Sequence, residues 1–208
     1  LCIKMYLPKV IIVEVKKTYI YLKNIIKWAK ENPEMKEISL IPFDNLVLQL
    51  DQIADNLRSL LLKHHDFIVK EISEISGYKW SKESPVIYVY PTAFFNSFSH
   101  PLFLRVGRVH EGRVIPRKPG HLLGTLIHEL CHNNFDVPET EREITEDLIN
   151  HTVLLILDKL DPSYVEEYRK FNEMIGIKMT LELIPEKIKS GELSIKEFYE
   201  INERGPRL

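Results

Sequence analysis

Two histidines and one glutamate stand at a spacing that suits metal-dependent hydrolysis, in the segment His128-Glu129-Leu130-Cys131-His132. Residues four apart on a helix lie on the same face, so His128 and His132 can direct both imidazoles at one ion. Glu129 lies one position round the helix, where it can hold a water molecule bound to that ion. In this H-E-x-x-H arrangement two histidines bind zinc and the glutamate is the general base of a hydrolase. The segment therefore predicts a catalytic Zn²⁺ site.

The residues around the motif favour a helix that packs into a protein core. Four apolar residues precede His128, and the two positions inside the motif carry no charge: Leu122, Leu123, Leu126, Ile127, Leu130 and Cys131. A helix with inward-facing ligands needs this pattern because its other faces must also pack. The alternative is a surface helix with two incidental histidines, and that alternative does not account for the apolar flanks.

A catalytic zinc site usually has three protein ligands and an open position for water, and the acidic stretch from Glu139 to Asp147 offers the third ligand. If the motif helix and the next helix form an antiparallel hairpin, Glu143 lies about 10 Å beyond the turn, level with the histidine pair at about 9 Å. Asp147, four residues later on the same face, could accept the free ring N–H of a ligating histidine. We therefore expect Glu143 as the third ligand with Asp147 behind it. Glu146, with Asn150 four residues on, is the alternative.

These two helices resemble the gluzincin branch of the zinc metallopeptidases, in which a glutamate on a downstream "glutamate helix" is the third ligand and an aspartate follows four residues later. The resemblance covers roughly Val86 to Leu160 and is nearest to the small minigluzincins. No Gly-x-x-His follows the motif, which excludes a metzincin. The longer zincin signature is matched at four positions: Thr125, Leu126, Leu130 and Cys131.

The resemblance implies a zinc metallopeptidase whose Glu129 is the general base for a zinc-bound water. Its substrate would be a peptide or protein, laid as an extra strand along the edge of a small sheet. The strand expected over Leu102–Val109 could offer that edge. A donor that stabilises the tetrahedral oxyanion is also expected, and the sequence offers three candidates: His151, Tyr164 and Tyr168.

The sequence pattern around these residues predicts the helices and strands that position them, and together they indicate a mostly helical α+β fold. Helices are expected over Tyr19–Lys30, Leu46–Ile75, the motif segment after Pro119-Gly120, Val137–Leu160, Tyr164–Ile175 and Ser194–Asn202. Strands are expected over Val10–Val15, Val86–Tyr90, Leu102–Val109 and Val114–Ile115. We expect a small, largely antiparallel sheet packed on the zinc-binding helix and the glutamate helix.

The chain of 208 residues is expected to divide near residue 80. Residues 1–80 would form an N-terminal helical region that acts as a lid, prosegment or docking part. Residues 81–208 would form the zincin-like metallopeptidase domain with its C-terminal helices. Within the first region, His64 and His65 are adjacent and point about 100° apart on a helix, so they are expected to be solvated rather than to share a metal.

Charge, apolar runs and cysteine content limit the binding partners and the cellular compartment that the sequence predicts. A formal net charge of -2 offers no long-range attraction to nucleic acid or to an anionic membrane. The longest apolar run, near Val153–Leu157, is far short of the ~20 residues of a membrane span. Cys2 and Cys131 cannot make a disulfide framework, which favours a reduced, cytoplasmic setting. A small core thiol is the interpretation preferred for Cys131.

Two alternatives to a peptidase remain open. One is a zinc hydrolase that acts on a non-peptide bond, since the same ligands would serve it. The other is a metal-stabilised regulatory or binding module without activity. Glu129 separates the second from an enzyme, because a structural zinc site has no use for a base and usually has four protein ligands, rich in cysteine.

Overall fold

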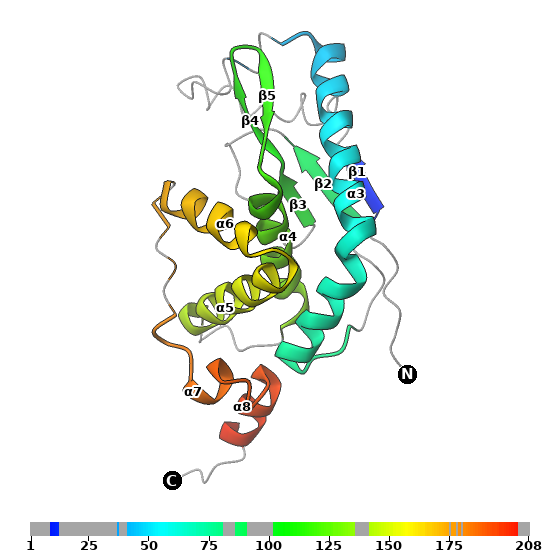
Figure 1. Ribbon diagram of the computed structural model, residues 1–208. Coiled ribbons are helices and arrows are strands. Elements are labelled where there is room, and N and C mark those ends of the chain that lie inside the picture. The colour runs from blue at the N-terminus through cyan, green and yellow to red at the C-terminus, as the bar shows by residue number, and fades with distance from the viewer. Residues whose placement is uncertain are drawn as a thin grey trace. The chain divides into compact units, whose positions relative to one another are not determined.

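The computed structural model of this chain describes residues 9–12, 37, 41–80, 86–90, 102–135, 142–174, 176–177, 179 and 181–203. Most of these residues are helical and the fold is α+β with little sheet, which confirms the predicted class (Figure 1). The helix expected over Tyr19–Lys30 lies outside the described residues. No helix among those described is both long and apolar enough to cross a membrane.

The chain folds into two compact units, each made of separate stretches of sequence. Unit 1 consists of Leu1–Met5, His64–Glu83 and Pro119–Leu208, and unit 2 consists of Tyr6–Lys63 and Ser84–Lys118. Helix α3 (Phe43–Ser76) contributes its N-terminal part to unit 2 and its C-terminal part to unit 1. This division differs from the expected one near residue 80.

Unit 2 contains a three-stranded parallel sheet of β1 (Lys9–Ile12), β2 (Val86–Tyr90) and β3 (Leu102–Arg105), in that order. The expectation of a largely antiparallel sheet is wrong for these strands. The sequence favoured it because two or three short strands directly precede the motif helix, and antiparallel pairs are the commoner kind. The long connection that contains α3 joins β1 to β2 and allows their parallel pairing. Buried β-branched and leucine side chains form the sheet's core: Ile87, Val89, Leu102 and Leu104.

The other sheet of unit 2 is the antiparallel hairpin of β4 (Gly107–His110) and β5 (Arg113–Pro116), as the sequence predicts. Its two turn residues, Glu111 and Gly112, have φ of 49° and 72°. Positive φ at both positions is typical of a type I′ turn, whose twist matches that of the strands it joins. Val109 and Val114 face the core, and the N–H of Val114 donates to Oε1 of Gln49 on α3 (2.7 Å).

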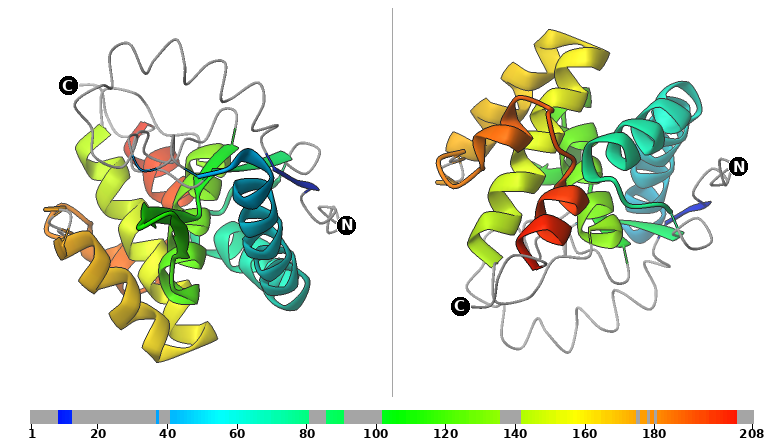
Figure 2. Two further views of the ribbon diagram at one scale, coloured as in Figure 1. Left: turned by 90° about the horizontal axis from the view of Figure 1, so that it is seen from above. Right: turned by 90° about the horizontal axis from the view of Figure 1, so that it is seen from below.

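Unit 1 is built on three helices that pack side by side in both views of Figure 2: α4 (Pro119–Asn134), α5 (Arg142–Leu160) and α6 (Pro162–Met174). Gly120 and Gly124 of α4 lie where α6 approaches, and a Cβ on either would fall within 3 Å of Tyr164 or Tyr168. The absence of these two Cβ atoms therefore permits the close approach.

The C-terminal helices of unit 1 are α7 (Glu186–Lys189) and α8 (Ile195–Glu203). The predicted capping box is confirmed at α8: the Glu197 carboxylate accepts from the Ser194 N–H (2.9 Å), and the Glu197 N–H donates to the Ser194 hydroxyl (3.3 Å). Ile184, Ile188 and Ile195 join Leu148 of α5 in one buried cluster.

The prediction that His64 and His65 are solvated is wrong. Their exposed fractions are 9% and 2%. Both belong to the part of α3 that carries Leu61, Ile68 and Ile72 into a core, and tertiary packing covers polar side chains that the helix periodicity alone left outside. Nδ1 of His65 lies 3.1 Å from a carboxylate oxygen of the exposed Asp66.

A buried ion pair in unit 1 supports a stability prediction. Glu71 of α3 is 7% exposed and pairs with Lys159 of α5, which is 52% exposed. We expect Lys159→Met to lower the free energy of unfolding by about 1–3 kcal/mol, because it leaves a buried carboxylate without its cation while water still screens part of the site. Chemical denaturation measures the change. Lys70→Met, which breaks the exposed pair with Glu74, is the control and should stay within about 0.5 kcal/mol of wild type. Equal effects of the two variants would contradict the prediction.

Candidate metal centre

Helix α4 has two glycines and two histidines spaced four residues apart. Gly120, Gly124, His128 and His132 follow one another at intervals of four, so each lies next to the following one along a ridge that winds slowly round the helix. The two glycines make room for α6, and the two histidines continue the ridge by two further turns. At the start of the helix, the Gly120 N–H donates to a carboxylate oxygen of Glu167 on α6 (2.9 Å), which supplies a negative charge at the positive helix end.

The structure brings His128, His132 and Glu146 together. The two imidazole Nε2 atoms are 3.2 Å apart. Nε2 of His128 lies 3.5 Å from Oε2 of Glu146 on α5, and Nε2 of His132 lies 3.5 Å from Oε1 of the same carboxylate. The side chains are 22%, 28% and 39% exposed, so the cluster is open to solvent on one side. It is the only set of three or more metal-binding side chains found together among the described residues.

These separations fit zinc. Tetrahedral Zn²⁺ bonds to histidine nitrogen and carboxylate oxygen at about 2.0–2.2 Å, which places two ligand atoms about 3.3–3.6 Å apart. The observed 3.2 and 3.5 Å lie close to that value. Two nitrogens and one carboxylate from the protein also leave a fourth position for water, as in catalytic rather than structural sites.

The environment of His128 suits a ligand. Burial first, and the neighbouring His132 second, lower the pKa of His128 to about 4. The ring is therefore neutral near pH 7 and keeps a lone pair for an ion. Its other nitrogen, Nδ1, is buried and has no hydrogen-bond partner within the described stretches.

Glu143, the expected third ligand, lies in the first turn of α5, and its side chain is outside the described part of the structure. Its role stays a prediction, whereas the alternative ligand, Glu146, is seen beside both histidines. Asp147 is buried and accepts the Leu183 N–H (3.2 Å). It does not accept from His128, so its expected support of that ligand is not seen here.

Glu129, the expected general base, is buried on α4 between the two histidines in sequence. It is 7% exposed, and its backbone carbonyl accepts from the side-chain amide of Asn133 (2.9 Å). Burial first, and the nearby Glu146 second, raise its pKa to about 7. A carboxyl group with a pKa near neutrality can both take and return a proton at physiological pH.

Tyr168 of α6 lies beside the same carboxylates. Its ring packs against Gly124, one turn before His128, and it is 5% exposed. Burial raises the pKa of Tyr168 well above its ordinary value, and the charges of Cys131, Glu129 and Glu146 act in the same direction, against the hydrogen bond with Asn172, which lowers it. The phenol therefore stays protonated. Sequence reasoning proposed this residue without a reason to prefer it.

The other two candidate oxyanion donors are placed differently. The backbone of Tyr164 lies against Gly120, at the start of α4 and away from the histidines. His151 of α5 has its Nε2 buried, and burial and Lys189 of α7 lower its pKa.

Two features of the site were missed in the sequence. The Gly120-x-x-x-Gly124 spacing indicates a close contact with another helix, but Gly120 was interpreted only as part of a break before the motif helix. The capping of α4 by Glu167 left no local sign, because 47 residues separate the two partners. The expected core thiol is confirmed: Cys131 is fully buried, and burial raises its pKa well above the ordinary value.

With this geometry in view, the chain was compared with protein-family models, with curated proteins and with solved structures, and none of the three comparisons found a match.

Proposed function

We propose that this protein is a zinc-dependent hydrolase, and specifically a metallopeptidase. The observation that carries the proposal is the cluster of His128, His132 and Glu146, with donor separations of 3.2–3.5 Å, next to the buried Glu129. The nitrogen and carboxylate donors and the tetrahedral spacing favour zinc over magnesium or calcium, which prefer all-oxygen sites.

The roles of the residues follow from their positions. Bound zinc would lower the pKa of its water to near 7 and polarise a carbonyl group. His128, His132 and Glu146 would hold the ion. Glu129 would take a proton from the water and pass it to the leaving amine, for which a pKa near 7 is suitable. The resemblance to gluzincins supports a peptide as the substrate.

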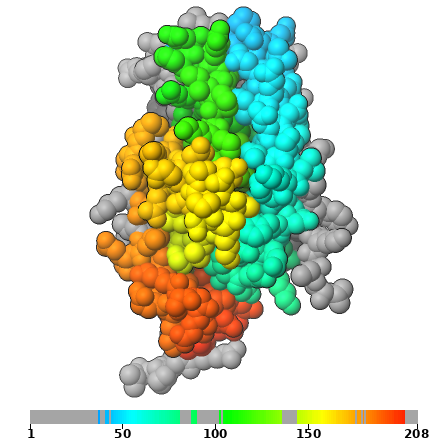
Figure 3. Space-filling model, in the orientation of Figure 1, coloured from blue at the N-terminus to red at the C-terminus, as the bar shows by residue number. Residues whose placement is uncertain are grey.

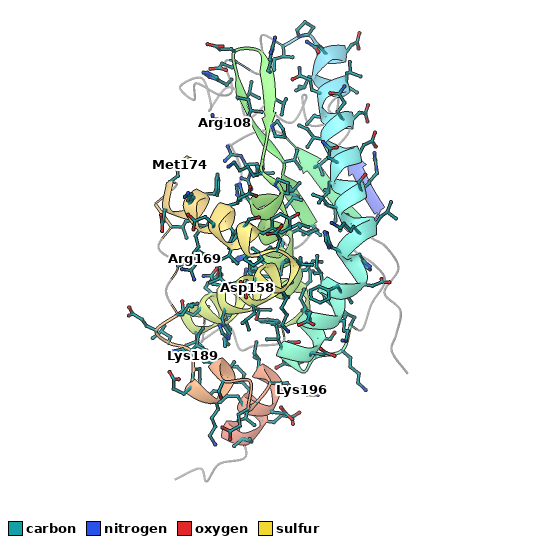
Figure 4. The ribbon with its side chains drawn as sticks, in the orientation of Figure 1. Arg108, Asp158, Arg169, Met174, Lys189 and Lys196 are labelled. Carbon is teal, nitrogen blue, oxygen red and sulfur yellow. The ribbon has the colours of Figure 1, made fainter. Side chains whose placement is uncertain are left out.

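Zinc content tests the metal site first. Wild-type protein and its variants, purified identically and reconstituted with zinc, are compared by inductively coupled plasma mass spectrometry. We expect about one zinc per chain in wild type and in Glu129→Gln, and little in Glu146→Ala. Asp158→Ala, which removes an exposed carboxylate of the same helix (Figure 4), is the control and should keep its zinc.

The outcomes separate the alternatives. Loss of zinc in Glu143→Ala but not in Glu146→Ala would keep the enzyme and return the third ligand to Glu143. Wild type without zinc would refute the proposed function. Zinc without cleavage of any peptide in a random library would favour a hydrolase of non-peptide substrates or a metal-stabilised binding module.

Tyr168 is the oxyanion donor that the described structure supports best. We expect Tyr168→Phe to lower kcat for peptide hydrolysis about 10- to 100-fold with little change in zinc content, because it removes one donor to the developing charge. Tyr164→Phe is the matched control and should change kcat less than about twofold. A Tyr168→Phe variant with wild-type kcat would exclude Tyr168 from this role.

A further inference from the structure

The outer face of the β4–β5 hairpin gathers positive charge. Arg108 and His110 of β4 and Arg113 of β5 are exposed, and the exposed Lys118 follows the hairpin. The strand register places His110 directly opposite Arg113 and Arg108 diagonal to it. Figure 3 shows this hairpin beside the N-terminal half of α3, with its atoms in green at the surface.

Two acids lie at the turn of the hairpin among the described residues. Glu111 lies 3.9 Å from His110, and a carboxylate oxygen of Glu37 accepts the Glu111 N–H (2.8 Å). Arg108, Arg113 and Lys118 form no ion pair with the residues that the structure describes. Like charges on neighbouring positions of a strand pair are destabilising. The face therefore favours an anionic partner, although the whole chain has a net charge of -2.

The hairpin is bonded to α3 along β5, and no described residue pairs with the outer edge of β4. The N–H of Val114 donates to Gln49, so the outer edge of β5 is bound to α3. The backbone N–H of Arg117 donates to the carbonyl of Val106 (2.9 Å), so residues 106 and 117 are a hydrogen-bonded pair. Hydrogen-bonded and non-hydrogen-bonded pairs alternate along an antiparallel ribbon, and the register therefore makes Val109 and Val114 a non-hydrogen-bonded pair. The N–H and C=O of Val109 therefore point away from β5. Within the described part of the chain they have no partner.

An extended acidic peptide is the occupant that would use both features. A peptide added to the open edge of β4 would bond to the main chain of Val109. Its side chains on one face would recur every second residue, as Arg108 and His110 do. A nucleic acid or an anionic membrane would use the cations alone and leave the open edge unused. The face also lacks the aromatic side chains on which single-stranded nucleic acids stack.

We propose that the β4–β5 hairpin binds an extended acidic peptide segment, which adds a strand to β4 and places carboxylates at alternate positions against Arg108 and Arg113. The inference rests on the proposed function in so far as this segment belongs to a protein substrate. It then names the substrate class: proteins with an exposed, extended, acidic stretch.

Fluorescence anisotropy at low salt tests the proposal with a labelled, capped peptide in which Glu and Thr alternate. The protein is the full chain carrying Glu129→Gln, in the presence of EDTA, so that neither zinc nor hydrolysis is needed. We expect binding that weakens about tenfold or more when Gln replaces each Glu of the peptide, and that weakens with added salt. A peptide with N-methyl groups on its edge-facing amides should also bind less tightly, because it cannot add a strand.

Matched variants locate the site. Arg108→Gln and Arg113→Gln should each weaken binding about three- to tenfold. Arg169→Gln removes the same charge from an exposed position of α6 and should change binding less than about twofold; Figure 4 labels Arg108 and Arg169. All three positions are exposed, so circular dichroism should show an unchanged fold.

Equal binding of the Glu and Gln peptides would overturn the proposal, and so would an effect of Arg108→Gln no larger than that of Arg169→Gln. Arginine-dependent binding of double-stranded DNA or of phosphatidylserine vesicles, without binding of the peptide, would overturn it in favour of another partner. Peptide binding is measured on metal-free protein, so it should persist even if the proposed zinc site binds no zinc. Conversely, zinc content should stay unchanged even if the hairpin binds no peptide.

Discussion

Glu129→Gln is expected to lower peptide hydrolysis about 10²- to 10⁴-fold while zinc stays bound. The amide keeps the size and most of the packing of the carboxyl group, but it cannot accept a proton from water. Since Glu129 does not belong to the metal-binding cluster, the ion should be retained. The measurement is kcat/KM on the library peptide that wild type cleaves best, with zinc content determined on the same samples.

The same substitution should stabilise the metal-free protein. The folded-state pKa of Glu129 is raised from 4.5 to about 7, so the folded protein holds this proton more tightly than the unfolded chain does. The resulting stability is fully present below about pH 4.5 and is lost as the pH rises through about 7. Above that pH a buried carboxylate must be ionised, which costs up to about 3 kcal/mol, and glutamine avoids this cost.

Urea denaturation of metal-free wild type and Glu129→Gln at pH 5 and pH 8 checks the sign. The variant should gain stability mainly at pH 8, and bound zinc should reduce the gain because its charge favours the carboxylate. His128, whose pKa is lowered, destabilises both proteins alike as the pH falls toward 4 and cancels in the comparison. Glu173→Gln, at an exposed position of α6, is the control. A variant that is less stable than wild type at pH 8 would contradict the prediction.

Gly124→Ala is expected to lower the free energy of unfolding by about 2 kcal/mol or more. Alanine in a helix interior is favoured over glycine by about 1 kcal/mol. Here that gain is outweighed, because the new Cβ would lie 2.3 Å from Cδ2 of Tyr168 and 2.8 Å from its Cγ, parts of the ring that a small rotation cannot remove. Moving α6 away from α4 would open the packing beside His128.

A double mutant tests the cause. In a Tyr168→Leu background the contact is removed, so Gly124→Ala should cost much less or even stabilise the protein. Gly176→Ala is the control for the glycine itself: its Cβ meets nothing within 4 Å, and only the φ of 78° opposes it, at about 1 kcal/mol. Denaturation midpoints with and without zinc give the comparison. Additive effects of the two substitutions would exclude the Tyr168 contact as the reason.

Local physical rules explain what could be predicted. Gly77 ends α3 with φ of 75°, as its position after a long apolar repeat indicated. Ser194 and Glu197 cap α8, and the histidines four apart face one point. Each of these features depends on residues within one or two turns of one another, so one sequence suffices to find it.

The tertiary structure decided the rest, because it depends on contacts between residues far apart in the chain. The sequence by itself determined that His128, Glu129 and His132 share one buried helix, since spacing and apolar flanks require it. It could not determine which residues of α5 meet α4, and that contact brings Glu146 to the histidines. It also could not determine the burial of His64 and His65, the parallel order of β1 to β3, or the contact of Tyr168 with Gly124. Each of these follows from how whole elements pack, which side-chain periodicity within an element does not specify.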